Sequence, residues 1–451
     1  MTYERATAYL LGTINETISR AVPHRLARMA ALLGHLGNPH LQYPTVHVGG
    51  TSGKGSTATM IAAALTASGK RTGLHTKPHL VSMTERARID GVAISEEAFG
   101  DLLGEMLGAI DATMHEFGRP SFYETTLALA FAYFARENVD IAAIEVGIGG
   151  TLDGTNLVQP EVSVITNVGL DHTELLGDTP ALIARDKSGI AKPGVPLVSD
   201  AVTEAREMIE ATCARVGAPF IGVSDVATIV ARPSEPYRQS FAVTTAHDTY
   251  ELDLPVLGRF QQRNATTAIV ALEQLRAELR PSRGAIERAF AQLVIPGRME
   301  FFPGFPSVIF DVAHNPDKAA SLAEALRETF PDRRFLFVVG IGETKDAAAI
   351  LAIWFDLPAT FIFTSFDTPG RTAERPQRLA NIASNAGVTA RTIADPIEAL
   401  AVARRHADGS HVVVVTGSTF VPAILRAWWL PVVTGVVART CRRAYASLSA
   451  A

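Results

Sequence analysis

A glycine-rich turn that carries one lysine is the stretch of this sequence with the clearest chemical potential. It follows Thr45–Val48, a β-branched run that predicts a short buried strand, and it precedes 56–65, which predicts a helix. Glycines allow backbone N–H groups to face a phosphate, and a helix N-terminus adds partial positive charge. Lys54 would reach the outer phosphates. The turn therefore predicts a phosphate site made of Gly50, Thr51, Ser52, Gly53, Lys54, Gly55 and Ser56.

This turn is a variant of the P-loop and departs from the strict pattern at two places. Val48 stands where the strict pattern has its first glycine, and Gly55 follows the lysine in place of Ser or Thr. The variant Gly-Thr-x-Gly-Lys-Gly-Ser does fit. The alternative is an ordinary glycine-rich turn with Lys54 as a surface charge. The coincidence of strand, glycines, lysine and hydroxyls favours the phosphate site.

Three more side chains that could do chemistry follow predicted strands or end a predicted helix. Glu145 lies near the end of an apolar strand, 141–146, and His172 follows a strand predicted at 162–166. Lys187 lies in the last turn of a predicted helix. In open parallel sheets ligands bind beyond the carboxyl ends of the strands, so Glu145 and His172 could direct a metal ion or a water molecule. The alternatives are a solvated acid, a polar loop histidine and a lysine favoured by the helix dipole.

A polar loop between positions 76 and 91 mixes basic groups, a histidine and hydroxyls without regular periodicity. Its candidate binding residues are Lys77, His79 and Arg86. Irregular loops of this kind often carry binding groups, although a solvated connection would have the same composition.

The composition is that of a globular enzyme, with 451 residues, 47% apolar and 19% charged. The net charge of −5 gives no reason to expect nucleic acid as a partner. The two cysteines, Cys213 and Cys441, exclude a disulfide framework and favour the cytoplasm. We expect no signal peptide, because the first residues lack an apolar core. We expect no membrane span either, because the apolar stretch 427–438 is too short and contains Pro431.

The elements that must position these residues form an α/β fold in two parts. A helical region is expected at 3–36, alternating strands and helices follow it, and a long helix is expected at 258–279. Pro296-Gly297-Arg298 marks a boundary. A second alternating series has strands expected at 308–311, 335–339, 360–364 and 411–415. We therefore expect a P-loop-type domain at 1–295 and a smaller, parallel, Rossmann-like domain at 296–451.

An ordered set of short motifs along nearly the whole chain resembles the folylpolyglutamate synthase/dihydrofolate synthase family, a branch of the Mur ligases. Each motif alone is weak, but ten in the correct order are specific. Besides the phosphate turn, they are Leu36-Gly37-Asn38-Pro39, Pro78-His79-Leu80 with Glu85-Arg86, Glu145-Val146-Gly147, Leu152-Asp153-Gly154-Thr155-Asn156, Gly169-Leu170-Asp171-His172-Thr173, Asp186-Lys187-Ser188-Gly189-Ile190, Gln261 with Asn264, Pro296-Gly297-Arg298, and Asp311 with His314-Asn315-Pro316.

The resemblance implies an ATP-dependent amide ligase that also uses Mg²⁺. A substrate carboxylate would attack the γ-phosphate to give an acyl phosphate, and the amine of L-glutamate would then displace phosphate. Such a reaction depends mainly on positioning and on charge neutralisation. The expected partners are a pteroate- or folate-type acid and L-glutamate, and we expect a monomer.

The resemblance also implies roles for particular residues. Lys54, Glu145, His172 and Lys187 would form the catalytic set. Glu145, His172 and Lys187 would bind magnesium, with Lys187 carbamylated so that it becomes a carboxylate-like ligand. ATP would lie between the two domains, held by the phosphate turn and by Asn264, Arg298, Asp311 and His314. The substrate-binding residues would be Lys77, His79, Arg86 and Asp153.

Four positions depart from the family pattern, and one of them is Gly154, where the family has alanine. Lys77 stands where the family usually has a magnesium-binding serine, Thr151 replaces an arginine, and Thr344 replaces the first aspartate of Asp-Lys-Asp. An ammonium group cannot bind a metal ion, so Lys77 could replace one ion as a fixed charge. The alternatives that remain are a Mur-type ligase for a different acid and amine, a P-loop ATPase that drives a partner protein, and an inactive binding protein.

Overall fold

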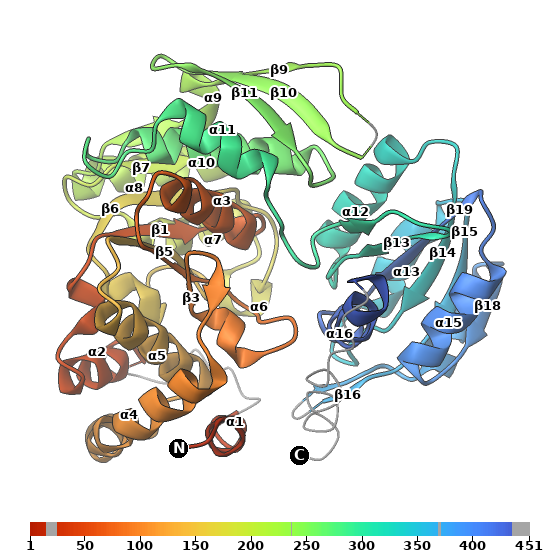
Figure 1. Ribbon diagram of the computed structural model, residues 1–451, viewed down its shortest axis with the longest axis horizontal. Helices are drawn as coiled ribbons and strands as arrows, with labels where there is room; N and C mark the ends of the chain where they lie inside the picture. Colours follow the sequence, from red (N-terminus) through yellow and green to blue (C-terminus); the bar gives the residue numbers. More distant parts are fainter. Residues whose placement is uncertain (15–24, 236, 369–370, 435–451) are drawn as a thin grey trace.

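The computed structural model describes residues 1–14, 25–235, 237–368 and 371–434, and its two main sheets lie in separate halves of the molecule (Figure 1). The sheet of the first half has eight strands in the order β4-β3-β2-β5-β1-β6-β7-β8. Its central strand β1 is wholly buried and runs parallel to β5 and β6 on either side. The strands are β1 (Thr45–Gly49), β2 (Thr72–His75), β3 (Arg88–Ile89), β4 (Val92–Ala93), β5 (Ile141–Glu145), β6 (Pro160–Ile165), β7 (Leu197–Ser199) and β8 (Phe220–Gly222).

Helices cover both faces of this sheet because alternate strand residues face opposite sides. Val46 and Val48 belong to the apolar cluster under α3 and α10, whereas Ala142 and Ile144 belong to the cluster under α4 and α5. A three-stranded antiparallel sheet, β11-β10-β9, packs outside α10 and α11 (Figure 1). The elements are α3 (Lys54–Ala67), α4 (Glu96–Phe117), α5 (Phe122–Arg136), α6 (Thr173–Leu176), α7 (Pro180–Lys187), α8 (Thr203–Val216), α9 (Val223–Val226), β9 (Thr228–Ala231), β10 (Gln239–Thr244), β11 (Thr249–Leu254), α10 (Phe260–Glu273) and α11 (Arg283–Ala291).

Three expected helices have different limits in the structure. The helical region at 3–36 consists of α1 (Tyr3–Leu11) and α2 (Arg25–His35), and the part at 15–24 lies outside the described residues. Helix α3 begins at Lys54, two residues earlier than expected, because its N-cap is Gly53, which has a left-handed φ of +80°. Gly53 has no side chain, so no side-chain hydrogen bond caps this helix. Helix α10 ends at Glu273 and not at 279, because the N–H groups of Gln274 and Leu275 donate to carbonyl oxygens three residues earlier, as in a turn. Pro281, which cannot continue a helix, follows.

The second half contains a six-stranded sheet in the order β12-β13-β19-β14-β15-β18. It is parallel as expected, except that the short edge strand β12 pairs antiparallel with β13 and was not expected. Helices α12, α13 and α14 cover one face, and α15 and α16 cover the other. The elements are β12 (Glu300–Phe302), β13 (Ser307–Phe310), α12 (Pro316–Thr329), β14 (Arg334–Val339), α13 (Ala347–Phe355), β15 (Ala359–Phe363), β16 (Asp367–Thr368), β17 (Arg371–Thr372), α14 (Pro376–Asn385), β18 (Ala390–Thr392), α15 (Pro396–His406), β19 (His411–Thr416) and α16 (Phe420–Thr434).

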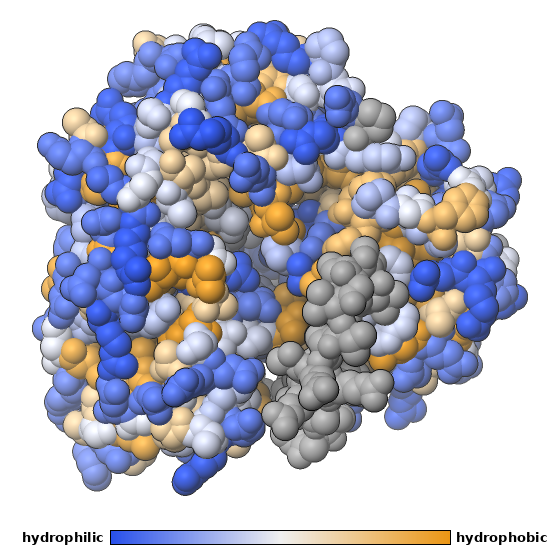
Figure 2. All heavy atoms as spheres, in the orientation of Figure 1, coloured by the Kyte–Doolittle hydropathy of each residue, from blue (hydrophilic) through white to orange (hydrophobic). Residues whose placement is uncertain are grey.

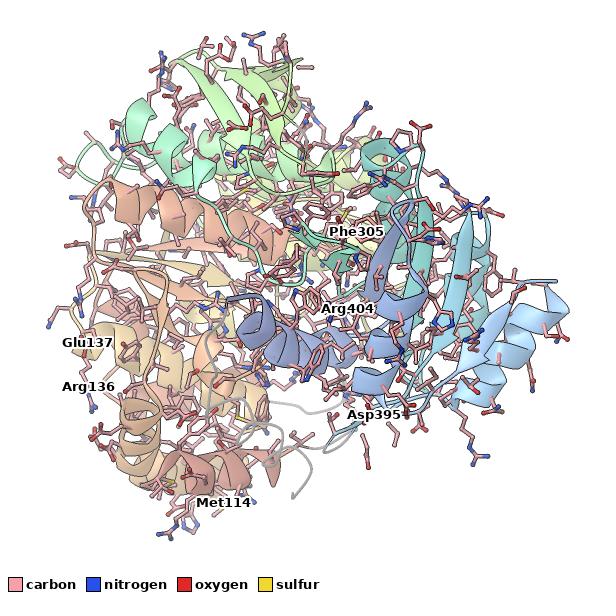
Figure 3. The ribbon with its side chains drawn as sticks, turned by 45° about the vertical axis from the view of Figure 1, so that its right-hand side comes forward. Met114, Arg136, Glu137, Phe305, Asp395 and Arg404 are labelled. Atoms are coloured by element: carbon pink, nitrogen blue, oxygen red, sulfur yellow. The ribbon has the colours of Figure 1, made fainter. Side chains whose placement is uncertain are left out.

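The late apolar stretch packs on the second sheet as far as the structure describes it. Leu425 and Trp429 of α16 are buried, and the Arg404 guanidinium of α15 lies 4.7 Å from the centroid of the Trp429 ring. Figure 3 labels Arg404. Positions 435–438 lie outside the described residues, as does Cys441. Within the described residues, no helix combines the length and the apolarity needed to span a bilayer. In the space-filling view the surface is hollowed where the two halves face each other (Figure 2).

Candidate active site

The phosphate turn joins β1 to α3 at the edge where the carboxyl ends of β1, β5 and β6 meet. Gly50 and Gly53 have φ angles of +136° and +80°, which side chains rarely adopt. A Cβ on Gly50 would also overlap the hydroxyl of Thr166, and a Cβ on Gly53 would overlap the amide oxygen of Asn264. These glycines therefore allow β6 and α10 to approach the turn, and the Asn264 side chain lies against Gly53.

The loop after β6 holds the phosphate turn in shape. The Thr51 hydroxyl donates to the carbonyl oxygen of Gly169 (3.1 Å) and accepts from its N–H (3.0 Å). The Asn167 side-chain oxygen accepts from the N–H of Ser52 (2.8 Å), and the Thr166 hydroxyl donates to the carbonyl oxygen of Ser52 (2.6 Å). Sequence reasoning missed Thr166 and Asn167. Their signal was that polar residues directly follow a buried strand expected in the same parallel sheet.

Two lysines donate to a single backbone oxygen of the turn. Lys54 Nζ lies 2.9 Å from Gly50 O and 3.1 Å from Thr51 O, and Lys187 Nζ also lies 2.9 Å from Gly50 O. Burial, together with the charges of Lys77 and Lys187, holds the pKa of Lys54 well below its usual range. Burial lowers the pKa of Lys187 to about 8. Such a concentration of positive charge favours an anion as the ligand.

Glu145 lies beside the first turn of α3. Its side chain is buried, and its Oε2 lies 3.1 Å from the position that a Cβ on Gly55 would take. The same oxygen accepts a hydrogen bond of 2.9 Å from the backbone N–H of Lys77. Ser56, one residue further along, is buried in the same turn of α3. Glu145 is thus a buried carboxylate next to the predicted phosphate site.

His172 lies at the rim of the site, one-third exposed, with a φ of +52° just before α6. Its ring nitrogens lie 4.0 Å from Asp171 Oδ2 and 3.9 Å from Glu174 Oε1. Burial lowers the pKa of His172 in spite of these two acids. In the described ranges, no three His, Cys, Asp or Glu side chains converge as a metal site. A site completed by a carbamate on Lys187 stays a prediction.

Asp311 and His314 follow β13 in the second half. Asp311 is buried and accepts from the N–H groups of Met299 (2.9 Å) and Ala313 (2.8 Å), and burial raises its pKa. His314 Nδ1 donates to Val312 O (2.8 Å), and burial lowers the His314 pKa to about 3, so the ring is neutral. The hydrogen bonds of Asp311 therefore hold the backbone after β13 in shape. His314 uses Nδ1 as a donor within this segment, so its Nε2 is an acceptor for other groups.

Arg298 precedes β12 and lies on the same side of the second half as Asp311. Its Nη1 donates to Gly297 O across 3.4 Å, and its positive charge opposes the rise in the pKa of Asp311 that burial causes. The second half thus brings a cation next to the buried acid that the resemblance also assigned to the nucleotide.

Lys318 is a residue of this site that sequence reasoning missed. It lies in the first turn of α12, with Nζ 3.3 Å from His314 Nε2 and 3.9 Å from Asp171 Oδ2, and burial lowers its pKa to about 8. Asn315 Nδ2 also donates to Asp171 Oδ1 (3.4 Å). Both contacts cross from one half to the other. The available signal was a cation in the first turn of a helix, where the dipole disfavours it.

The polar loop at 76–91 is folded around Glu85. The Glu85 carboxylate accepts from the N–H groups of Leu80, Val81 and Ser82, at 2.9–3.0 Å. The loop therefore has a defined shape and is not merely a solvated connection.

Three of the predicted substrate residues, His79, Arg86 and Asp153, lie in a buried region in which Arg86 and Asp153 both interact with Tyr123. Arg86 is buried, donates to His79 Nδ1 (2.9 Å) and lies 5.0 Å from the centroid of the Phe122 ring. Burial lowers the pKa of His79 to about 3 and that of Arg86 to about 10. Asp153 is also buried, and it accepts from the Tyr123 hydroxyl at 2.8 Å. The Asp153 oxygens also accept from Thr155 N (3.0 Å) and Ile148 N (3.1 Å). The hydrogen bonds of Asp153 thus order the loop after β5.

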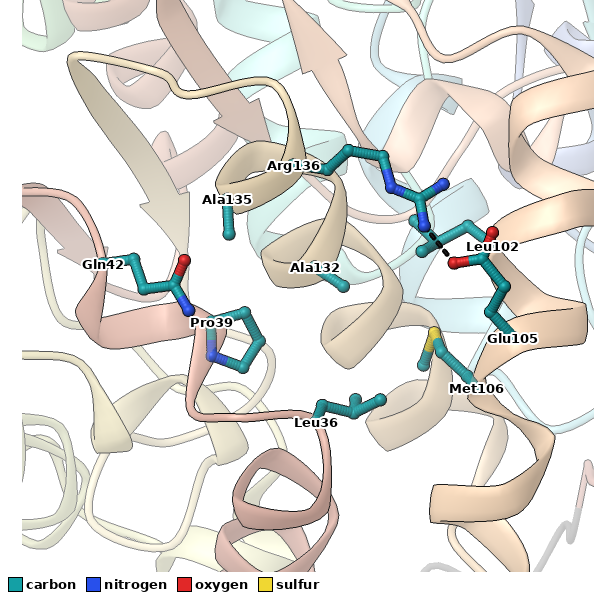
Figure 4. Close-up of a pocket in the computed structure, with 9 residues that line it drawn as sticks. All are labelled: Leu36, Pro39, Gln42, Leu102, Glu105, Met106, Ala132, Ala135 and Arg136. Atoms are coloured by element: carbon teal, nitrogen blue, oxygen red, sulfur yellow. Dashed lines mark hydrogen bonds and ion pairs between the residues drawn. The ribbon is translucent and has the colours of Figure 1, made fainter.

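A separate cavity of about 260 Å³ lies beyond these residues, between α4 and the end of α5 (Figure 4). An ion pair between Glu105 and Arg136 closes one side of it. None of the predicted site residues is among those that line it: Leu36, Pro39, Gln42, Leu102, Glu105, Met106, Ala132, Ala135 and Arg136.

The two halves match two domain families in order. Residues 48–272 match the Mur ligase middle domain, and residues 297–419 match the glutamate ligase domain of the Mur ligases. The fold and the phosphate turn therefore define a Mur ligase. Within that class, the chain belongs to the folylpolyglutamate synthase/dihydrofolate synthase family. The predicted family, the α/β fold class and the ligase class are confirmed.

Relatives and solved structures support this assignment across most of the chain. The chain is 32% identical to the dihydrofolate synthase/folylpolyglutamate synthase of Bacillus subtilis over 404 residues, which cover 88% of this chain and 92% of the relative. It is 36% identical over 414 residues to a probable bifunctional folylpolyglutamate synthase/dihydropteroate synthase of Haloferax volcanii, covering 91% of this chain but only 49% of that relative. Escherichia coli FolC in complex with DHPP and ADP superposes with a TM-score of 0.84 at 28% identity, over 95% of this chain and 98% of FolC.

Proposed function

We propose that this protein is an ATP-dependent ligase that joins the amino group of L-glutamate to the carboxylate of a pteroate- or folate-type acid. The observation that carries the proposal is the set of lysines around the phosphate turn, in which Lys54 and Lys187 share one carbonyl oxygen and Lys318 approaches from the second half. The names of the relatives and the FolC complex with DHPP and ADP support the choice of substrates. The lysines would neutralise the phosphates of ATP.

The proposed reaction has two bond exchanges. A carboxylate oxygen of the acid bonds to the γ-phosphorus, and the bond to the departing ADP breaks. The amine nitrogen of glutamate then bonds to the carbonyl carbon of the acyl phosphate, phosphate leaves, and the amine gives up a proton. The backbone N–H groups of residues 50–56 and the ammonium of Lys54 would hold the phosphates during the first exchange.

A magnesium ion would be held by Glu145, His172 and carbamylated Lys187, and it would neutralise charge on the transferred phosphoryl group. Glu145 fits this role because it is a buried carboxylate beside the phosphate turn. Lys187 fits it only as a carbamate, since an ammonium would repel the ion. Its pKa of about 8 favours that change, because the neutral amine bonds to the carbon of CO₂ and releases one proton.

The remaining predicted residues have proposed roles in the same complex. ATP would lie between domains at 1–295 and 296–451, against Asn264, Arg298, Asp311 and His314. The acid would lie near Lys77, His79, Arg86 and Asp153, and closure of the domains would exclude water from the acyl phosphate. We further propose a monomer in the cytoplasm, which the small number of cysteines supports.

Phosphate release measured across candidate acids tests this function. Dihydropteroate, tetrahydrofolate and unrelated acids would each be incubated with ATP, with and without L-glutamate. We expect sustained phosphate release only with a pteroate-type acid and glutamate together. Activity with a different acid would instead favour another Mur-type ligase, and release that needs neither acid nor amine would favour an ATPase.

A further inference from the structure

The first turn of α12 lies opposite the phosphate turn, although the two belong to different halves of the molecule. A Cβ on Gly169 would lie 3.7 Å from Asp317 Oδ2 on one side and 3.9 Å from Thr51 Cγ2 on the other. Gly169 itself is hydrogen-bonded to the Thr51 hydroxyl. A single residue thus separates α12 from the phosphate turn, so a long side chain from α12 can reach a phosphate held there.

Lys318 is such a side chain, and several forces oppose its positive charge. It lies in the first turn of a helix, where the macrodipole repels cations, and it is only 28% exposed. The charges of Arg298, Lys77 and Lys345 further disfavour its ammonium form. An ammonium in this position is favourable when an anion shares the space.

Among the described residues, the carboxyl groups on which the charge of Lys318 acts include Asp171, Asp317 and the buried Asp311. Asp171 Oδ2 lies 3.9 Å from Lys318 Nζ, beyond hydrogen-bonding distance, while His314 Nε2 accepts from it at 3.3 Å. Asp317 adds negative charge, but burial and the charge of Asp171 raise its pKa. Lys318 therefore has a loose ion pair and one neutral acceptor, which leaves its ammonium with capacity to bind a further anion.

The position of Asp171 indicates which part of a nucleotide Lys318 would meet. Lys318 Nζ lies 3.9 Å from Asp171 Oδ2, and the charges of Lys318 and Lys54 both lower the pKa of the Asp171 carboxyl, so a lysine of each half acts on Asp171. Lys54 is the lysine expected at the outer phosphates. We propose that Lys318 is a ligand of the γ-phosphate, supplied by the second half and resting near Asp171 when no nucleotide is bound. This inference rests on the proposed use of ATP.

A γ-phosphate ligand in the second half would couple nucleotide recognition to closure of the site. ATP would draw Lys318 away from Asp171, whereas ADP ends before the point that Lys318 reaches. When the γ-phosphoryl group is transferred to the acid, ADP would no longer carry the group that Lys318 contacts, and this loss would ease the release of ADP. Lys318 would thus distinguish triphosphate from diphosphate.

Calorimetric titration of the full-length protein with β,γ-methylene ATP and with ADP tests the proposal. Lys318→Met removes the charge and keeps most of the side-chain length, and Lys318→Arg keeps the charge. Arg327→Met is the matched control, because it removes an exposed cation from the last turn of the same helix. Circular dichroism would check the fold, and Lys318→Gln would replace the methionine variant if that variant does not fold.

We expect Lys318→Met to weaken binding of β,γ-methylene ATP about tenfold or more and binding of ADP less than about threefold. Lys318→Arg should recover most of the loss, and Arg327→Met should leave both affinities unchanged. Equal losses for the two nucleotides, or no loss, would overturn the proposal, because a lysine that only pairs with Asp171 cannot sense the γ-phosphate. A wild-type protein that binds neither nucleotide would contradict the proposed function itself.

Discussion

Lys54 and Lys187 donate to the same carbonyl oxygen of Gly50 at equal distances, so their nitrogens are at most twice 2.9 Å apart. Two ammonium groups this close repel each other, and burial strengthens the repulsion by excluding water. Burial is the main cause of the lowered pKa of both lysines, and the charge of Lys187 lowers the pKa of Lys54 further. Bound phosphates, or conversion of one amine to a carbamate, would relieve it. The chemistry proposed for the site thus follows from individual side chains.

Lys54→Ala should lower the ligation rate by a factor of about 10² or more, because it removes charge stabilisation from the transferred phosphoryl group. The fold should persist, since Lys187 still donates to Gly50 O. Steady-state kinetics with a thermal melt would measure both effects. Lys70→Ala, which removes a cation just beyond the other end of α3, is the control. Near-normal turnover of Lys54→Ala would overturn the phosphate site.

Carbamylation of Lys187 should increase as pH rises from 7 to 9 at a fixed concentration of dissolved CO₂. A pKa of about 8 leaves about a tenth of these side chains neutral at pH 7, and the neutral fraction grows with pH. Carbon-13 NMR with labelled CO₂ would detect the carbamate. Lys187→Ala should be inactive and partly rescued by acetate. A fully active protein with an unmodified Lys187 would rule out this role.

Lys77→Ser should allow a second metal ion to bind to the nucleotide complex. The backbone N–H of Lys77 donates a hydrogen bond to Glu145, and the charge of the Lys77 side chain lowers the pKa of both Lys54 and Lys187. Lys77 therefore already supplies positive charge where a metal ion would otherwise be needed. Titration with Mn²⁺, followed by electron paramagnetic resonance, would count the ions. We expect one ion in the wild type and two in the variant. Two ions in the wild type would contradict charge replacement.

At the scale of elements, α3 begins at Lys54 because a left-handed glycine, Gly53, precedes it. Gly53→Ala should lower activity strongly, since it strains the backbone and its Cβ would overlap the Asn264 side chain. Gly69→Ala is the matched control, because Gly69 has a similar φ of +86° but open space around it. We expect each variant to lose about 1 kcal/mol of stability from backbone strain, and only Gly53→Ala to lose nucleotide binding as well. Equal nucleotide affinity in the two variants, measured by calorimetry, would contradict the close approach of α10.

The elements that follow local rules could be predicted from the sequence. The β-branched run at 45–48, the glycine turn and the strand that ends at Glu145 each depend on neighbours along the chain, and the parallel sheet then brings their ends together. Lys318 could not be placed in this way, because its contact with Asp171 depends on how the second half packs on the first. Asp153 shows the same limit, since its hydrogen bond with Tyr123, thirty residues earlier in the chain, requires tertiary structure.

At the scale of the whole molecule, the site is assembled from both halves. Contacts that join them include Asn315 and Lys318 on Asp171, the ion pair of Arg259 with Glu328, and the Tyr237 ring stacked on Phe301 with centroids 4.3 Å apart. The contacts of Asn315 and Lys318 with Asp171 are polar and lie beside the phosphate turn, so these side chains can exchange partners when a ligand binds. An acyl phosphate formed between the halves would be protected from water.

The central claim is that the acid is activated as an acyl phosphate before the amine attacks. Isotope transfer tests it most directly, with an acid whose carboxylate oxygens are both ¹⁸O, together with ATP and L-glutamate. One labelled oxygen should appear in each released phosphate, because that oxygen bonds to phosphorus in the first step and leaves with it in the second. The phosphate would be analysed by mass spectrometry. Phosphate without ¹⁸O, formed at the rate of the amide product, would contradict the account.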